Sequence, residues 1–278
     1  MSAFTARLKQ VAAAAAARLG VLAAATDVYL LLRNRQRPAA SSGGPAPHTG
    51  IALPPPILRL SSAGTTDVDW FLRSGAAAYR LLEELGAKDG GAILDFGCGC
   101  GRVLRHVPPG DRDRHRGVDW NRRAIRWCRR NLAPMRFVRC GLAPPLPDGL
   151  GRRFGLVYAF SVFTHLTEDL QAPWLAELAA RLELGGVLLI STHGKSYLSD
   201  LSMEERARFE VGELVVRQPR VAGTNVCAAY HPAEAMQRLV PPGLEVLEHR
   251  PAGALGNPTQ DLWVLRRTSG MLAMPARP

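Results

Sequence analysis

The chain has 278 residues, of which 47% are hydrophobic, and it carries a formal net charge of +11. This length and apolar content suit one large domain with appendages and exclude a disordered chain. The five cysteines have no regular framework spacing, which excludes a disulfide-rich secreted scaffold and predicts free thiols in a reducing, cytoplasmic compartment.

The positive charge is concentrated in two segments. Residues 1–40 hold six basic residues against one acid, and residues 101–140 hold twelve arginines against three aspartates. The second segment includes a predicted helix over Asn121–Asn131 whose arginines fall mostly outside its apolar stripe. Such a face suits a phosphate backbone. The alternative is a solvated face in an arginine-rich chain without interleaved aromatic residues, and we favour this second interpretation.

The first 65 residues predict two appendages. Residues 1–36 are rich in alanine and predict an exposed or peripherally docked helix. Its apolar runs are broken by Arg18 and Asp27 and are too short to span a bilayer, so we expect no membrane span. Residues 37–65 are dense in Pro, Ser and Gly and predict a linker.

A regular α/β pattern occupies residues 66–267, followed by a predicted flexible tail over 268–278. A helix is expected from Thr66, as the capping residue, to Gly86. Alternating strands and helices follow and indicate a doubly wound, mostly parallel sheet, whose strands should bring ligand-binding residues together at their carboxyl ends. The expected strands are 92–96, 115–119, 135–140, 155–160 and 186–192, and the expected helices are 102–107, 121–132 and 168–182.

The rhythm of strands and helices breaks over residues 195–230. This insertion reads as a short charged helix around 203–209 and two strand-like runs, 213–217 and 225–230, before a helix that Pro232 opens. It should lie over the carboxyl ends of the strands. Two interpretations stay open: a lid over a substrate, or an elaborated connection without a binding role.

The most informative motif is the glycine-rich segment Asp95-Phe96-Gly97-Cys98-Gly99-Cys100-Gly101-Arg102. Three alternating glycines after a strand leave a loop with little side-chain bulk, against which a nucleoside can lie. A dinucleotide fingerprint needs a small residue where Arg102 stands, and a triphosphate loop needs a Lys followed by Ser or Thr. The motif therefore argues against both a dinucleotide site and a triphosphate site.

The pattern of an acid and three alternating glycines resembles the first motif of the class I S-adenosylmethionine-dependent methyltransferases. The resemblance implies a Rossmann-like sheet with an antiparallel last strand, which Leu244–His249 and Asp261–Arg267 would supply, and S-adenosyl-L-methionine as cofactor. It also implies that the acid ending the second strand, Asp119, binds the ribose hydroxyls. The expected cofactor-binding residues are Asp95, Phe96, Gly97, Cys98, Gly99, Gly101, Asp119, Trp120, Leu142 and Phe160.

The resemblance also directs attention to the turn after the fourth strand, Phe160–Leu166. His165 is the expected general base, because imidazole titrates near neutral pH and this turn faces the cofactor; a His bonded within the core is the alternative. His193 and His231 are the second and third choices. The turn lacks the motifs of the family's adenine, glutamine-amide and cytosine-C5 enzymes. After the third strand Cys140-Gly141-Leu142 replaces the usual acid or amide, so backbone groups would have to bind adenine.

Three functional hypotheses follow. The leading one is a methyltransferase, similar to a bacterial small-molecule or glycan-associated subgroup, that acts on a hydroxyl or amine of a small metabolite or sugar. The second is an RNA methyltransferase that uses the arginine-rich face, and the third is a non-catalytic binding module with the same fold. We expect no metal, because Cys98 and Cys100 lie inside the glycine loop without a second ligand pair.

Overall fold

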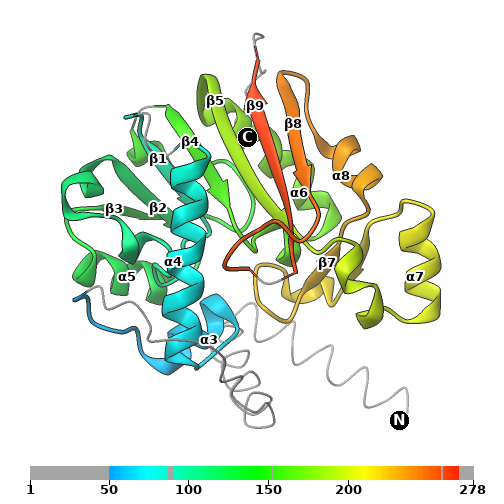
Figure 1. Cartoon of the computed structure of the whole chain (residues 1–278), viewed down its shortest axis with the longest axis horizontal. Helices are drawn as coiled ribbons and strands as arrows, with labels where there is room; N and C mark the ends of the chain where they lie inside the picture. The colour runs from blue at the N-terminus through cyan, green and yellow to red at the C-terminus, as the bar shows by residue number, and fades with distance from the viewer. Residues whose placement is uncertain (1–49, 87–89, 152, 258, 269–278) are drawn as a thin grey trace.

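A computed structural model of the chain describes residues 50–86, 90–151, 153–257 and 259–268. These residues form a seven-stranded sheet with the strand order β3-β2-β1-β4-β5-β9-β8 (Figure 1). The first five strands are parallel, and β9 pairs antiparallel with both β5 and β8, as predicted. The strands are β1 (Ile93–Phe96), β2 (His115–Asp119), β3 (Arg136–Arg139), β4 (Phe154–Ala159), β5 (Leu182–Thr192), β8 (Leu244–Arg250) and β9 (Asp261–Arg267).

Helices cover both faces of the sheet. The helices α4 (Val68–Glu84) and α5 (Arg122–Asn131) pack their apolar residues on one face, together with Ile93 and Tyr158. The helices α6 (Glu168–Arg181) and α8 (Ala233–Leu239) cover the other face (Figure 1). This doubly wound arrangement places the carboxyl ends of the parallel strands at one open edge.

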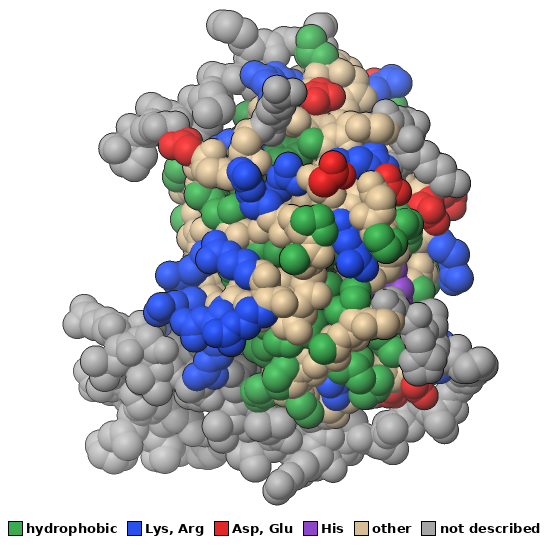
Figure 2. All heavy atoms as spheres, turned by 90° about the vertical axis from the view of Figure 1, so that its left-hand side faces the viewer, with side chains coloured by type: hydrophobic (Ala, Val, Ile, Leu, Met, Phe, Trp, Pro, Cys, Tyr) green, Lys and Arg blue, Asp and Glu red, His purple; other side chains and the backbone are tan. Residues whose placement is uncertain are grey.

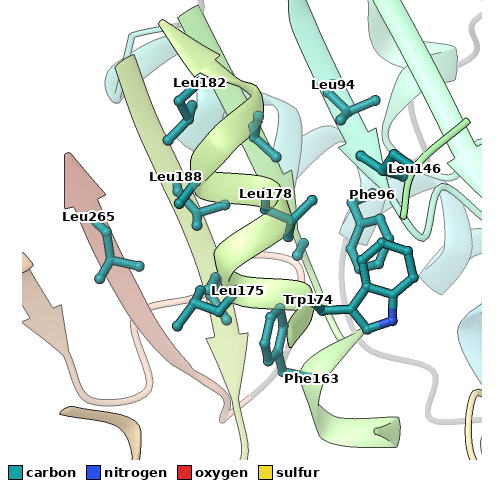
Figure 3. Close-up of a cluster of buried hydrophobic side chains, with 14 of the residues drawn as sticks. Leu94, Phe96, Leu146, Phe163, Trp174, Leu175, Leu178, Leu182, Leu188 and Leu265 are labelled. Carbon is teal, nitrogen blue, oxygen red and sulfur yellow. The ribbon is translucent and has the colours of Figure 1, made fainter. Parts of the chain in front are cut away.

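The core beneath α6 fixes the end of β1. Phe96 packs against Trp174 with ring centroids 4.5 Å apart, and Leu175 and Leu178 continue the same apolar face of α6 (Figure 3). Full burial of each such side chain stabilises the fold by about 1.5–3 kcal/mol. Because Phe96 immediately precedes Gly97, this packing also holds the start of the glycine loop.

The prediction of a linker over residues 37–65 is wrong for the last part of this range. Residues Pro56–Ala63 form helix α3, with Leu58 and Leu60 buried and Pro56 at its first turn, where a missing N–H costs nothing. The dense prolines at 54–56 therefore mark a helix start. The predicted N-terminal helix over 1–36 and most of the tail lie outside the described residues.

Two other local predictions differ from the structure. The helix expected over 102–107 is only a short 3-10 turn, η1 (Leu104–His106). Helix α4 begins after Asp67, whose carboxylate caps the backbone N–H of Trp70, whereas Thr66 was expected to be the cap. An Asp is as good an N-cap as a Thr, so the sequence alone does not separate these neighbours. None of the helices in the described ranges is long and apolar enough to cross a bilayer.

The insertion after β5 folds at the carboxyl ends of the strands. It contains α7 (Met203–Glu210) and a two-stranded sheet of β6 (Val215–Arg217) and β7 (Ala228–Tyr230), near the predicted positions. An ion pair between Glu205 and Arg217 ties α7 to β6, and Arg217 lies over the ring of Tyr230. In Figure 1 the insertion and α3 lie at the same edge of the main sheet.

Candidate functional site

The glycine loop turns sharply at the end of β1. The backbone N–H groups of Gly97 and Cys98 both donate to the carbonyl oxygen of Val118, at 2.8 and 2.9 Å, which binds the loop to the end of β2. Gly97 has a φ of 78°, and a Cβ at this position would lie 2.4 Å from Cγ2 of Val162. Only glycine fits here, because the conformation is left-handed and the turn after β4 is in contact.

Asp119 joins the glycine loop to the start of α5. One carboxylate oxygen accepts from the backbone N–H of Gly99 at 2.8 Å, and the other accepts from the N–H of Asn121 at 2.7 Å. The residue is only 8% exposed, and burial raises its pKa against the lowering effect of these two bonds. Each oxygen keeps a further lone pair, so the carboxylate can still accept from ligand hydroxyls.

Gly101 differs from the other two glycines of the motif. A Cβ on Gly101 would lie 2.3 Å from Cδ1 of Leu132, a fully buried residue that follows α5. Gly101 also does not line either of the cavities described below. The predicted contact of Gly101 with the cofactor is therefore not supported by the cavity lining. Gly101 instead allows the loop to pack closely against the end of α5.

We expect Gly101→Ala to lower the free energy of unfolding by about 1–3 kcal/mol, because a buried clash is added at a φ of 75°. Urea denaturation would measure the change. Gly149→Ala is the matched control, since a Cβ there meets nothing within 4 Å. An unchanged midpoint for Gly101→Ala would contradict the packing role.

Asp95 is the acid of the motif and is 5% exposed. Burial raises the pKa of Asp95 to about 7, against the lowering influence of Tyr158 and of the Arg102 guanidinium. Ionisation of this buried carboxyl group lowers the stability of the free protein. Carboxyl groups with a raised pKa are typical of functional sites.

Two adjoining cavities lie at this edge of the sheet. The larger has a volume of about 880 Å³ and the smaller of about 90 Å³. Ser62, Gly97, Ser161, His165 and Asn225 line both of them. The larger cavity also contacts the other predicted residues Asp95, Cys98 and Phe160, and the smaller one Phe96, Gly99, Asp119, Trp120 and Leu142.

Several lining residues had no signal in the sequence. Ser62 comes from the segment predicted as linker, and Trp70 and Arg73 come from the first turns of α4. Asn257 and Gln260 come from the loop between β8 and β9. These positions are brought to the cavities only by tertiary packing, so no spacing rule could identify them.

Residues 219–227 of the insertion, here called the roof segment, border the cavities: Gly223, Thr224 and Asn225 line the smaller one, and Asn225 also lines the larger one. The indole N–H of Trp120 donates to the carbonyl oxygen of Gly223 at 2.8 Å. The side-chain amide of Asn225 donates to the carbonyl oxygens of Leu60 and Ser61 at 2.9 and 3.1 Å, which joins the roof segment to α3. The insertion is therefore a structural part of the site.

Two histidines of the larger cavity are held by backbone carbonyls of the insertion. Nδ1 of His165 lies 2.7 Å from the carbonyl oxygen of Cys227, and Nδ1 of His193 lies 3.1 Å from that of Ala229. A carbonyl only accepts, so each Nδ1 carries the proton and each Nε2 is left as an acceptor. Burial lowers the pKa of both, that of His193 to about 3, so both are neutral at pH 7.

The third histidine candidate, His231, lies outside the two cavities. His231 is 1% exposed, lines neither cavity, and its Nε2 lies 2.9 Å from Oε1 of Gln171. It is a core residue of the α6 side. His165 and His193, by contrast, have ring centroids 6.4 Å apart in one cavity.

The arginine-rich face lies apart from the cavities. Figure 2 shows basic side chains gathered on one side of the molecule. A surface groove of about 390 Å³ is lined there by residues of α5 and β3, namely Arg122, Ile125, Arg126, Arg129, Arg130 and Arg139. None of these residues lines either cavity. Among the described residues, no group of three or more His, Cys, Asp or Glu is placed to hold a metal ion.

Comparison with known families identifies a domain in the first part of the sheet. Residues 93–186 match the family model described as a methyltransferase domain. The match begins at β1 and ends within β5. This part of the chain is therefore a methyltransferase domain, consistent with a class I S-adenosylmethionine-dependent enzyme. A search of curated proteins gave no match.

Solved structures of methyltransferases share the fold. The CcbJ methyltransferase from Streptomyces caelestis is 16% identical with a TM-score of 0.53, and the similarity covers 71% of this chain and 90% of that one. The glycopeptide N-methyltransferase MtfA with S-adenosyl-L-homocysteine is 16% identical with a TM-score of 0.51, covering 70% and 90%. DesVI from Streptomyces venezuelae is 17% identical with a TM-score of 0.50, covering 70% and 92%. At these identities the similarity supports the class I methyltransferase fold of the chain.

Proposed function

We propose that this methyltransferase transfers a methyl group to a hydroxyl or amine of a small metabolite or sugar. The observation that carries the proposal is the larger cavity, which contacts the glycine loop at one end and contains two neutral histidines with unprotonated Nε2 atoms. A cavity of this size lies within the usual range of roughly 300–1,000 Å³ for small-molecule sites.

The residues present fit S-adenosylmethionine. In the proposed placement, Asp119 binds the ribose hydroxyls with its remaining lone pairs, and Trp120 and Leu142 flank the adenine. Asp95, Gly97, Cys98 and Phe160 contact the methionine part in the larger cavity. The cofactor supplies a methyl group made electrophilic by the positively charged sulfur.

The chain itself mainly orients the acceptor and excludes water, as in-line displacement requires. The roof segment borders the cavities and supplies the carbonyl group that fixes the tautomer of His165. In the proposed mechanism, Nε2 of His165 accepts the proton that a hydroxyl or an ammonium group loses. His193 is the second candidate for the same step.

The chemistry of the cavity wall supports a polar acceptor. Trp70 and Tyr197 supply aromatic surfaces, while Asp69 and Gln260 supply hydrogen-bonding groups. Such a mixture suits a molecule with apolar ring faces and several polar substituents, as a sugar has. The similar fold of a glycopeptide N-methyltransferase agrees with an acceptor of this kind.

Transfer of label from S-adenosylmethionine to fractionated bacterial extracts tests the proposed acceptor class. We expect labelled product in small-molecule or glycan fractions that disappears with Asp119→Ala. Label only in an RNA fraction would contradict the proposal and favour the arginine-rich face. In that case neutralising Arg122, Arg126 and Arg129 should weaken salt-dependent RNA binding. Absence of transfer to every fraction would favour the non-catalytic module.

The affinity for S-adenosylhomocysteine should weaken up to tenfold per pH unit as the pH falls from 7 to 5.5. The ligand's amino group is cationic in this range and favours ionised Asp95, whose pKa in the free protein is raised to about 7. Calorimetry in two buffers of different ionisation enthalpy would also detect proton release on binding at pH 6. Asp95→Asn should bind weakly at every pH, and a flat wild-type profile would contradict this role of Asp95.

A further inference from the structure

The arginine-rich face of α5 and β3 has no part in the proposed methyl transfer. Residues 120–147, between Asp119 and Asp148, contain seven arginines and no acid. Five of these arginines, together with Ile125, line the surface groove described above. Within the described ranges, none of the five lies within ion-pair distance of an acid. The groove is therefore surrounded by five positive charges that no neighbouring acid balances.

The edge of the sheet holds two of these guanidinium groups in place. Nε of Arg129 donates to the carbonyl oxygen of Phe137 at 2.9 Å, and Nε of Arg139 donates to that of Trp120 at 3.1 Å. Because Nε is one of the five N–H donors of a guanidinium, each group keeps its Nη donors for an external acceptor. Donors that are fixed in this way are well suited to bind phosphate oxygens.

The other three arginines of the groove are placed by the geometry of α5. Arg122, Arg126 and Arg130 follow one another at intervals of four residues, so they lie along one side of the helix. All three side chains are exposed, and none makes a hydrogen bond to another described residue. Their charge can therefore be removed without breaking a contact of the described fold.

The lining of the groove distinguishes between two kinds of phosphate ligand. Proteins that bind single-stranded RNA combine basic side chains with aromatic rings on which bases stack. No aromatic residue lines this groove, and Trp127 of α5 packs instead on buried apolar residues of α3 and α4. The groove also shares no residue with either cavity, so a bound RNA would not be presented for methyl transfer. A lipid phosphate group needs neither feature.

The chain enters the described fold on the same side as α5 (Figure 1). The guanidinium of Arg105 donates to the carbonyl oxygens of Ile51 and Ala52 at 2.8 and 3.1 Å, which holds this entry in place. Residues 1–40, which precede it, hold six basic residues against one acid and include long apolar runs. Stable attachment to a membrane surface takes two signals, and a polybasic patch is one of them.

We propose that the arginine-rich face docks the protein on an anionic phospholipid bilayer, with lipid phosphate groups accepting hydrogen bonds from the arginines of α5 and β3. A cluster of about four to eight basic residues on an amphipathic helix is typical of this kind of binding. The aliphatic stems of arginine can lie along apolar surface while the guanidinium groups reach the lipid phosphates. This docking goes beyond the proposed methyl transfer and does not depend on it.

Co-sedimentation of the full chain with lipid vesicles tests the proposal. Vesicles of equal parts of phosphatidylcholine and phosphatidylglycerol should bind the protein, and vesicles of phosphatidylcholine alone should not. Each arginine near an anionic surface strengthens binding about fivefold, so joint replacement by Arg122→Gln, Arg126→Gln and Arg130→Gln should weaken it on the order of 100-fold. Added salt should weaken binding of the wild type as well. Equal binding of the wild type to both kinds of vesicle would overturn the proposal.

A matched control removes the same charge from other elements. The replacements Arg206→Gln, Arg238→Gln and Arg266→Gln lie at exposed positions of α7, α8 and β9 and should leave vesicle binding unchanged. Equal loss in the two triple variants would show an effect of net charge alone and would contradict docking by this face. Wild-type binding in the α5 variant would do the same. Thermal unfolding of both variants shows that the fold is kept, independently of cofactor binding.

Two further outcomes would assign the face differently. Tighter binding of the wild type to single-stranded RNA than to anionic vesicles at equal phosphate concentration, lost in the α5 variant, would make it a nucleic-acid surface and overturn the proposal. Absence of binding to both would leave it the solvated face of an arginine-rich chain and would equally overturn the proposal.

Discussion

Asp119→Ala should lower affinity for S-adenosylhomocysteine at least 100-fold. The substitution removes the proposed acceptor for the ribose hydroxyls, and charge-assisted hydrogen bonds of this kind contribute about 1.5–3 kcal/mol each. It also frees the backbone N–H groups of Gly99 and Asn121, whose only described side-chain acceptor is this carboxylate. Calorimetric titration of the purified chain would measure the loss.

Two controls separate a local effect from unfolding or a change of net charge. Asp113→Ala removes the same charge from an exposed position and should leave affinity unchanged. Asp119→Asn keeps the shape of the side chain but replaces one acceptor by a donor that faces a backbone N–H. It should therefore also bind weakly. Full affinity in folded Asp119→Ala would show that the ribose lies elsewhere.

His165→Asn should reduce kcat about 10²- to 10⁴-fold, the usual contribution of a positioned general base. An Asn amide can still donate to the carbonyl oxygen of Cys227, so the roof segment keeps this anchor. Cofactor affinity should therefore remain within about threefold of wild type, a small free-energy difference. The assay is release of S-adenosylhomocysteine with the acceptor found by the extract screen.

The pH profile gives an independent check on His165. Burial lowers the pKa of His165 below the ordinary value near 6.5, so the imidazole stays unprotonated and kcat at saturating cofactor should not fall as pH decreases from 8 to 6.5. His193→Asn tests the second candidate, and His249→Asn, which lines neither cavity, is the matched control. Full activity of His165→Asn with loss in His193→Asn would transfer the role to His193.

The sequence was sufficient to predict the order of strands and helices because the central strands β1, β4 and β5 contain short apolar runs and the helices between the strands carry apolar stripes. The glycine motif and Asp119 were also predictable, since they are fixed by backbone geometry next to a strand end. Helix α3 was missed because its prolines and serines are typical of a linker. Its place depends on tertiary contacts, namely the packing of Leu58 with Phe71 and Leu72 and the hydrogen bonds from Asn225.

The rest of the site could not be predicted for a related reason. Asn257 and Gln260 lie about 160 residues after the glycine motif, in a loop whose position depends on the antiparallel strand β9. The tautomer of His165 depends on a carbonyl group in the insertion, and no property of the His residue itself indicates it. Side-chain patterns predict elements, whereas these contacts depend on how the elements meet.

The roof segment has a consequence for the order of events in a catalytic cycle. Asn225 lines both cavities and is hydrogen-bonded to α3, and Gly223 is hydrogen-bonded to Trp120 on the side proposed for adenosine. The smaller cavity has a volume of about 90 Å³, below the roughly 300 Å³ of a typical small-molecule site, so in the cofactor placement proposed above we expect the segment to move when adenosine binds. Because the same short segment adjoins both cavities, we expect renewal of the methyl donor and departure of the methylated product to share one opening motion.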